Sequence, residues 1–140
     1  MAKKGDSYIV QIEEAHLMWG EYHPCRHSHS RRETYGEGYI KIPSTVAYDY
    51  CIFNNNNPYE ANTLYSCKSY DGYYKGTLLA QGNQDDPIYA KQFAEKGNLK
   101  GIGDWYDYVG ADVGDFVKVV FTAPNKILIE YNKDEFSFHI

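Results

Sequence analysis

The chain has 140 residues and a formal net charge of −5, and its length is typical of one domain. Apolar residues make up 43% of it, so the composition excludes an intrinsically disordered chain. A transmembrane helix needs an apolar run of about 20 residues, and the sequence contains none. Its first residues, MAKKGDSY, lack the apolar core of a signal peptide. The three cysteines are widely spaced. We therefore expect a cytoplasmic domain without disulfides that contacts no membrane.

The first third of the chain alternates short ordered elements with polar loops. Residues 1–6 are polar and are expected to form a flexible N-terminus. In Ser7–Glu13 apolar and polar positions alternate, which is typical of a strand. Residues 19–38 (WGEYHPCRHSHSRRETYGEG) contain almost no aliphatic side chain, and loops this long are usually functional or disordered. A strand at 38–42 (GYIKI) and a short helix at 43–50, which begins at a proline, are expected next.

Two hairpins are expected in the rest of the chain. Asn62–Ser69 and Tyr73–Ala80 are predicted strands separated by Asp71-Gly72, the dipeptide most typical of a hairpin turn. Gly114–Thr122 and Lys126–Tyr131 are the two clearest strands and are joined by Ala123-Pro124-Asn125.

Three further segments have weaker patterns. Tyr89–Lys96 is compatible with one or two helical turns, and Asp104–Val109 predicts a short helix that is capped by Asp104 and ended by Gly110. Alternating apolar residues at 136–140 predict one more strand. With no repeats and no linker, the chain is expected to fold over residues 1–140 as one mainly β domain with short helices, a half-open barrel of about seven strands.

The charge is unevenly distributed along the chain. Residues 16–41 contain four Lys or Arg residues, four of the five histidines and only three acids, whereas residues 104–115 contain four acids and no base. A net charge of −5 argues against a nucleic-acid binder, but a binding face needs only a local excess of basic groups. The chain has fifteen tyrosines and six phenylalanines, which also indicates a β-rich domain with a partly solvent-exposed functional surface.

Two stretches together resemble the plant B-three domain. They are DWYDYVGADVGDFVKVVF at 104–121, an aromatic-bearing helix followed by Gly-Asp and a strand, and GYIKIPSTVAYDY at 38–50, a strand, a proline and a short helix. A third stretch, YDGYYKGTLLAQGNQ at 70–84, resembles the bacterial versions of this fold that serve as recognition or effector domains of restriction endonucleases.

The resemblance implies a DNA-binding pseudobarrel whose two arms enter the major groove of double-stranded DNA. The first arm corresponds to residues 19–36 and the second to residues 81–91. It also implies a recognition module related to restriction and modification, with a nuclease as a possible partner.

The arms supply the candidate DNA-binding residues. Arginine binds guanine and phosphate bidentately, histidine donates hydrogen bonds, tyrosine packs on sugar, and amide side chains suit adenine. Lysine at the hairpin is a candidate phosphate contact, although lone surface lysines are mostly solvated. The candidates are Arg26, His27, His29, Arg31, Arg32, Tyr35, Lys75, Gln81, Asn83 and Gln84.

The sequence gives weaker support for a metal site or a nuclease active site. His23, Cys25, His27 and His29 alternate as possible zinc ligands, but four ligands in line on a strand do not form a tetrahedron, so we expect neither a metal nor another cofactor. An acid-x-Lys nuclease pattern is absent, and Asp115 with Lys118 is one residue too long for it, so we expect no catalytic residues and no enzyme.

Two alternatives to duplex binding remain open. One is a barrel that binds a small ligand or a protein. The other is a barrel that binds single-stranded RNA, with Tyr70, Tyr73 and Tyr74 as stacking groups.

Overall fold

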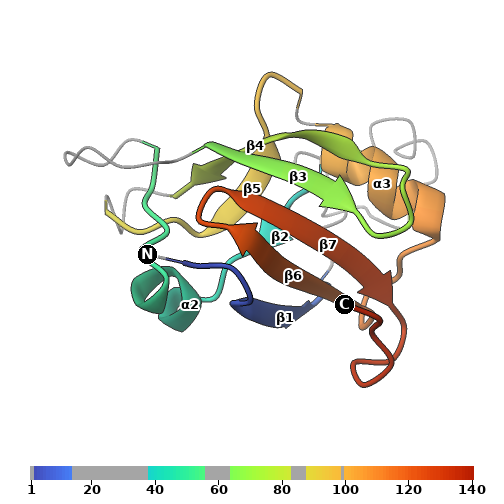
Figure 1. The fold of residues 1–140 in the computed structure, drawn as a ribbon. Helices are drawn as coiled ribbons and strands as arrows, with labels where there is room; N and C mark the ends of the chain where they lie inside the picture. The colour runs from blue at the N-terminus through green and yellow to red at the C-terminus, as the bar shows by residue number, and fades with distance from the viewer. Residues whose placement is uncertain (1, 14–37, 56–63, 83–87, 99) are drawn as a thin grey trace.

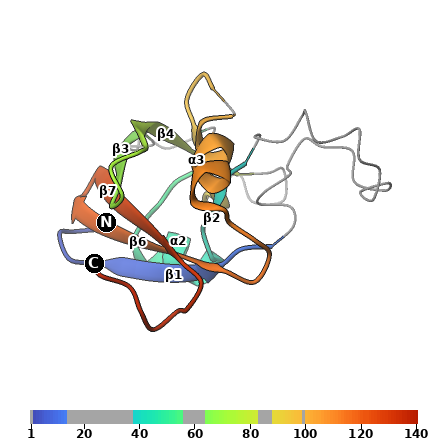
Figure 2. The same cartoon turned by 90° about the vertical axis from the view of Figure 1, so that its right-hand side faces the viewer.

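The computed structural model describes residues 2–13, 38–55, 64–82, 88–98 and 100–140. In these ranges seven strands form one nearly closed barrel, and two short helices lie at its opposite ends (Figures 1 and 2). The elements are β1 (Ser7–Gln11), β2 (Ile40–Lys41), α2 (Ser44–Asp49), β3 (Leu64–Ser69), β4 (Lys75–Gln81), β5 (Gln92–Glu95), α3 (Gly101–Val109), β6 (Phe116–Ala123) and β7 (Lys126–Asn132).

The sheet has the order β1-β6-β7-β3-β4-β5-β2, so β1 and β2 are its two edges. All neighbouring strands are antiparallel except β3 and β7, which are parallel. The curvature of the sheet brings the two edges towards each other, and the Tyr8 hydroxyl of β1 donates a hydrogen bond to the Lys41 carbonyl of β2 at 3.1 Å. This bond bridges the seam of the barrel.

Alternating residues of the strands fill the barrel. In β6, for example, Val117, Val119 and Phe121 are fully buried while the residues between them face outwards. The largest fully buried side chains, Trp105 of α3 and Phe93 of β5, belong to the same hydrophobic core. Such burial of aromatic area dominates the stability of a domain of this size.

Most predicted elements are confirmed, often with trimmed ends. The strands at 7–13, 38–42, 62–69 and 73–80 correspond to β1 to β4, and the helix at 43–50 is α2. The Asp71-Gly72 turn joins β3 to β4, with Gly72 at a φ of +86° that favours glycine. The mainly β barrel with two short helices is thus confirmed.

The expected helical turns at Tyr89–Lys96 are wrong, because this segment contains β5. Its helix-forming residues Gln92, Ala94 and Glu95 lie between two partners, since β5 pairs with β4 on one side and with β2 on the other. Buried Phe93 and Ala94 make the gain from pairing and packing larger than the local helix preference.

The expected start of the second helix is also wrong. α3 begins at Gly101, three residues before Asp104, and its N-cap residue Lys100 makes no side-chain cap. Asp104 lies in the first turn, where a carboxylate still favours the positive end of the helix dipole. The predicted end is confirmed, because Gly110 adopts the left-handed conformation at a φ of 71°.

The strand expected at 136–140 is wrong as well. Phe136 is 88% exposed, so the alternation of apolar residues there does not correspond to a buried face. Buried Glu130 holds this segment instead, since its carboxylate accepts hydrogen bonds from the backbone N–H groups of His139 and Ile140 at 2.8 and 3.1 Å.

No helix within the described ranges is long and apolar enough to cross a membrane.

Candidate nucleic-acid interface

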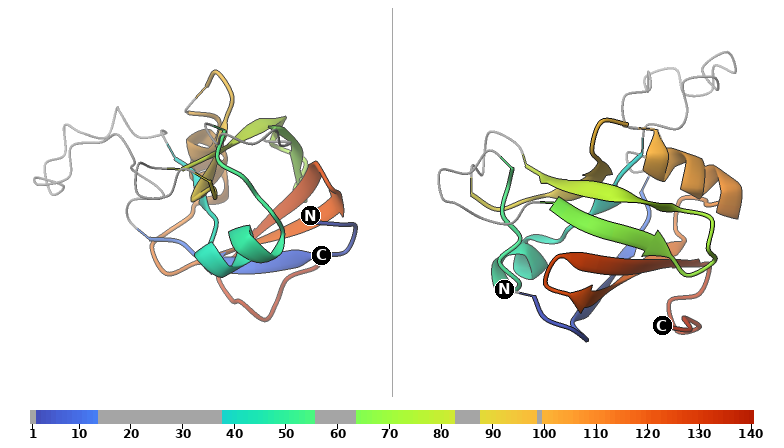
Figure 3. Two further views of the ribbon diagram at one scale, coloured as in Figure 1. Left: turned by 90° about the vertical axis from the view of Figure 1, so that its left-hand side faces the viewer. Right: turned by 45° about the horizontal axis from the view of Figure 1, so that its top comes forward.

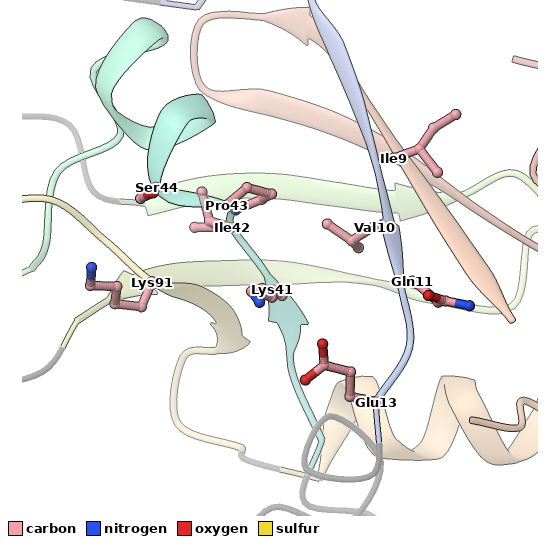
Figure 4. Close-up of a pocket in the computed structure, with 9 residues that line it drawn as sticks. All are labelled: Ile9, Val10, Gln11, Glu13, Lys41, Ile42, Pro43, Ser44 and Lys91. Atoms are coloured by element: carbon pink, nitrogen blue, oxygen red, sulfur yellow. The ribbon is translucent and has the colours of Figure 1, made fainter. Parts of the chain in front are cut away.

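A cleft of about 500 Å³ lies at the seam of the barrel, where the edge strands β1 and β2 face each other (Figure 4). Residues of β1 and Glu13 after it form one wall, and β2, the start of α2 and the residue before β5 form the other. Its polar lining consists of Gln11, Glu13, Lys41, Ser44 and Lys91. The cleft therefore contains two cations, one carboxylate and neutral hydrogen-bonding groups.

Described residues on both sides of the first predicted arm border this cleft, while the arm itself lies outside the described residues. Glu13, the last described residue after β1, lines it, and Lys41 of β2 lies on the opposite wall (Figure 4). Both ends are fixed to α3 and the loop that follows it: the Ile12 N–H donates to the Asp115 carbonyl at 2.8 Å, and the Tyr106 hydroxyl donates to the Tyr39 carbonyl at 2.9 Å. The barrel thus provides a firm base for this arm.

The base of the second predicted arm is equally well fixed. The Lys91 N–H donates to the Gln81 carbonyl at 2.6 Å, which closes the segment between β4 and β5. The rings of Phe53 and Tyr89 stack with centroids 5.6 Å apart, and their backbones form a β-bridge. Because Lys91 lines the cleft, the described end of the second arm borders it, as do residues that flank the first arm. The two arms themselves remain a prediction.

Two amide side chains are paired at the base of the second arm. Gln81 at the end of β4 is opposite Gln92 at the start of β5, and Gln92 Nε2 donates to Gln81 Oε1 at 3.3 Å. This bond uses Oε1 of Gln81 and one N–H of Gln92, so it does not take up the Nε2 donors of Gln81 or the Oε1 acceptor of Gln92. An amide that presents both a donor and an acceptor matches the N6 and N7 edge of adenine.

The predicted site residues are only partly described. Arg26, His27, His29, Arg31, Arg32, Tyr35, Asn83 and Gln84 lie outside the described residues and remain predictions. Gln81 is described and accepts a backbone hydrogen bond from Lys91, which lines the cleft, but its contact with DNA remains a prediction. Lys75 is exposed at the other end of β4, about 20 Å from Gln81 at the usual rise of a strand, and its contact with DNA remains a prediction.

The sequence reasoning missed three residues at the seam, Lys41, Lys91 and Gln92. The sequence does contain a signal for Lys41, because it occupies an outward-facing position in the predicted strand that follows the first arm. Lys91 lies at the end of the predicted second arm, and both Lys91 and Gln92 lie in the range expected to contain helical turns, so their approach to β2 was not predicted.

The structure describes the residue considered for a nuclease site, Asp115, but not the residues considered as zinc ligands. The alternating set His23 to His29 lies outside the described residues. Within the described part of the chain, no group of three or more His, Cys, Asp or Glu residues is placed to hold a metal ion. Asp115 has a structural role: its carboxylate accepts hydrogen bonds from the Asp112 N–H at 2.9 Å, from Lys133 Nζ at 3.2 Å and from the Tyr131 hydroxyl.

The tyrosines proposed as an RNA platform do not form one surface. Tyr74 is buried, and its hydroxyl donates to Glu95 Oε1 at 2.8 Å. Tyr70 stacks on His139, and Tyr73 stacks on Tyr108. The three side chains therefore do not provide consecutive stacking positions for a single strand.

Asp71 connects the β3–β4 turn to α3 at one end of the barrel. One carboxylate oxygen accepts from Ser69 Oγ at 2.7 Å and from the Tyr73 N–H at 2.8 Å, and the other accepts from Trp105 Nε1 at 2.9 Å. Partial burial acts to raise the pKa of Asp71, but these hydrogen bonds outweigh it and hold the pKa below its ordinary value.

This low pKa predicts that the protein loses stability in acid. The folded state binds a proton at Asp71 more weakly than the unfolded chain does, so its contribution is present above about pH 4 and is lost as the pH falls towards the folded-state pKa. Thermal unfolding followed by circular dichroism should show a smaller drop in melting temperature between about pH 7 and about pH 3 for Asp71→Asn than for the parent. An equal drop in both proteins would contradict the assignment.

Comparisons with known proteins address the fold. No protein-family model matches the chain, and no curated protein sequence matches it. Among solved structures, the chain is similar to the Arabidopsis FUS3–DNA complex, with a TM-score of 0.51 and 13% sequence identity over 91% of this chain and 97% of that chain. FUS3 is a plant B-three domain, so the similarity confirms a B-three-like pseudobarrel at the level of the fold.

Proposed function

We propose that this chain is a non-enzymatic module that binds double-stranded DNA with the seam of its barrel, held between the arms at 19–36 and 81–91. The main supporting observation is that residues flanking the first arm and the described end of the second arm border one cleft whose lining includes two lysines. One solved structure with a similar fold, the Arabidopsis FUS3–DNA complex, contains DNA.

The cleft and the arms would make different kinds of contact with a duplex. Lys41 and Lys91 are suited to phosphates, which provide affinity and fix the position of the duplex. The pair Gln81 and Gln92 is suited to adenine, and Arg26, Arg31 and Arg32 of the first arm are suited to guanine and phosphates. Acidic Glu13 lies in the same cleft and weakens its attraction for phosphate, so a modest affinity is expected.

The proposal can be tested by fluorescence anisotropy with a labelled duplex of random sequence, at salt concentrations from about 50 mM to about 200 mM. The parent should bind at low salt, and its affinity should fall as salt rises. The double substitution Lys41→Ala and Lys91→Ala should weaken binding and reduce the logarithmic salt slope by about 2, because each phosphate contact contributes about 1.

A matched control removes two exposed lysines that do not line the cleft, Lys96→Ala with Lys126→Ala. This variant has the same net charge as the test variant but should retain the parent's salt slope. No binding at low salt would refute duplex recognition, and equal losses in the two variants would refute the role of the cleft.

A narrower role in restriction and modification, with a separate nuclease as partner, follows from the resemblance of residues 70–84 to restriction-enzyme domains. Co-purification of a nuclease that cleaves only in the presence of this chain would support that role.

A further inference from the structure

An exposed pair of stacked tyrosines lies at the end of the barrel that α3 covers. The rings of Tyr73, in the β3–β4 turn, and Tyr108, in the last turn of α3, are nearly parallel at 7° with centroids 4.0 Å apart. Their exposed fractions are 51% and 58%. Large aromatic side chains that stay exposed in an ordered arrangement are typical of surfaces that bind a partner.

The framework beneath the two rings is held by specific bonds. Asp71, two residues before Tyr73, accepts hydrogen bonds from the Tyr73 N–H and from the indole of Trp105 in α3. Trp105 itself is fully buried. The turn and the helix are therefore held in a fixed arrangement. Binding of a partner here would need little further ordering of the surface, so the entropy cost of binding is small.

Two carboxylates lie beside the aromatic pair. Asp104 and Asp107 are exposed on α3, and Asp104 lies three and four residues before Asp107 and Tyr108, so all three share one helix face. Neither carboxylate forms an ion pair with a described residue. The last turn of α3 contains no basic residue, which leaves the negative end of the helix dipole unneutralised by a side chain.

Lysines are also present around this end of the barrel, and Lys68 of β3 is directly opposite Lys75 of β4. Lys75 lies two residues after Tyr73 at the start of β4, and Lys100 precedes α3 at the end remote from Tyr108. Lys133, beyond α3, is engaged by Asp115 at 3.2 Å and by Asp112 at 3.8 Å.

We propose that Tyr73, Tyr108, Asp104 and Asp107 form a docking surface for a basic, arginine-containing segment of a partner protein. A guanidinium group can stack on the free face of a tyrosine while its N–H groups donate to a neighbouring carboxylate. The same carboxylates repel phosphate, so the surface disfavours nucleic acid. Figures 1 and 3 show α3 and the β3–β4 turn at the end of the barrel opposite α2. None of the four residues lines the cleft between β1 and β2, so a duplex and a protein partner could bind at the same time.

The test is the affinity of the full chain for a fluorescently labelled peptide of alternating arginine and glycine, measured by anisotropy, with a lysine version of the same peptide for comparison. The arginine peptide should bind more tightly than the lysine peptide, because only the planar guanidinium stacks well on the rings. Replacing both rings, by Tyr73→Ala with Tyr108→Ala, should weaken arginine-peptide binding about tenfold.

Two control variants separate this surface from general attraction to an acidic chain. Tyr70→Ala removes another exposed, stacked tyrosine and should leave binding unchanged. Asp104→Asn with Asp107→Asn should weaken binding, whereas Asp49→Asn with Glu135→Gln, which removes two exposed acids elsewhere, should not. The Asp104 and Asp107 changes alter only the helix surface, so they remain informative if the tyrosine variant folds poorly.

Three results would overturn the proposal. They are a lack of peptide binding, equal losses in the test and control variants, and tighter binding of single-stranded RNA than of the peptide at these tyrosines. Duplex binding by the seam can be measured in the same variants and should be unaffected, so failure of this inference is distinguishable from failure of the proposed DNA-binding function.

Discussion

Replacing Trp105 with alanine is expected to lower the free energy of unfolding by about 3–5 kcal/mol, the usual cost of truncating a buried aromatic side chain. Trp105 is fully buried, so the substitution would leave a cavity between α3 and the barrel. It would also remove the donor to Asp71, which joins α3 to the β3–β4 turn at 2.9 Å. Urea denaturation followed by circular dichroism measures this change.

The matched control is Asp107→Ala on the exposed face of the same helix. An exposed substitution of this kind should change the free energy of unfolding by no more than about 0.5 kcal/mol. A loss of less than about 1 kcal/mol in Trp105→Ala would contradict the view that α3 is an integral part of the core.

The combined substitution of Arg26, Arg31 and Arg32 by alanine is expected to weaken duplex binding by about a hundredfold or more at low salt. Each arginine that contacts a base or a phosphate contributes about 1–3 kcal/mol to the free energy of binding. The three free-energy losses add, so the corresponding factors in the binding constant multiply. The prediction rests on the concentration of basic residues between two strands whose ends border the cleft. Fluorescence anisotropy with the random duplex measures the change.

Substitution of the same three arginines by lysine distinguishes charge from geometry. Lysine keeps the phosphate contacts but loses the bidentate donor pattern that reads guanine. This variant should therefore keep much of the non-specific affinity and lose preference among duplex sequences. Full retention of duplex binding in the alanine variant, with the fold intact, would show that the first arm takes no part.

Local patterns were sufficient to predict elements whose neighbours in sequence are also their neighbours in space. The β6–β7 hairpin is the clearest case, because alternating apolar residues and a short connection define both strands. The β3–β4 hairpin follows from Asp71-Gly72 for the same reason. The B-three-like order of elements then predicted the barrel, and the similarity of its fold to FUS3 confirmed it.

The seam could not be predicted in this way, because it depends on contacts between residues far apart in the sequence. Residue Lys91 approaches Lys41 only because β5 pairs with β2. The sequence around β5 favours a helix locally, and pairing on both edges overrides that preference. The stack of Tyr73 on Tyr108 was missed for the same reason, since the turn and the helix meet only in the folded barrel.

The arrangement separates two chemically distinct surfaces. The seam contains two lysines and lies next to a pair of amides, Gln81 and Gln92. The α3 end has exposed carboxylates and aromatic rings. Under the proposed DNA-binding function, the first surface would attract a duplex and the second would repel it, so the charge distribution would also orient the domain on DNA.

Nuclear magnetic resonance mapping of duplex binding tests the central claim most directly. The full chain, labelled with nitrogen-15, would be titrated with the random-sequence duplex at low salt, and amide shifts would be assigned along the barrel. The account predicts that the largest shifts among the described residues fall at the seam, on Gln11, Lys41, Lys91 and Gln92, while Asp107 and Tyr108 of α3 are unaffected. Shifts concentrated on α3, or no shifts at all, would contradict it.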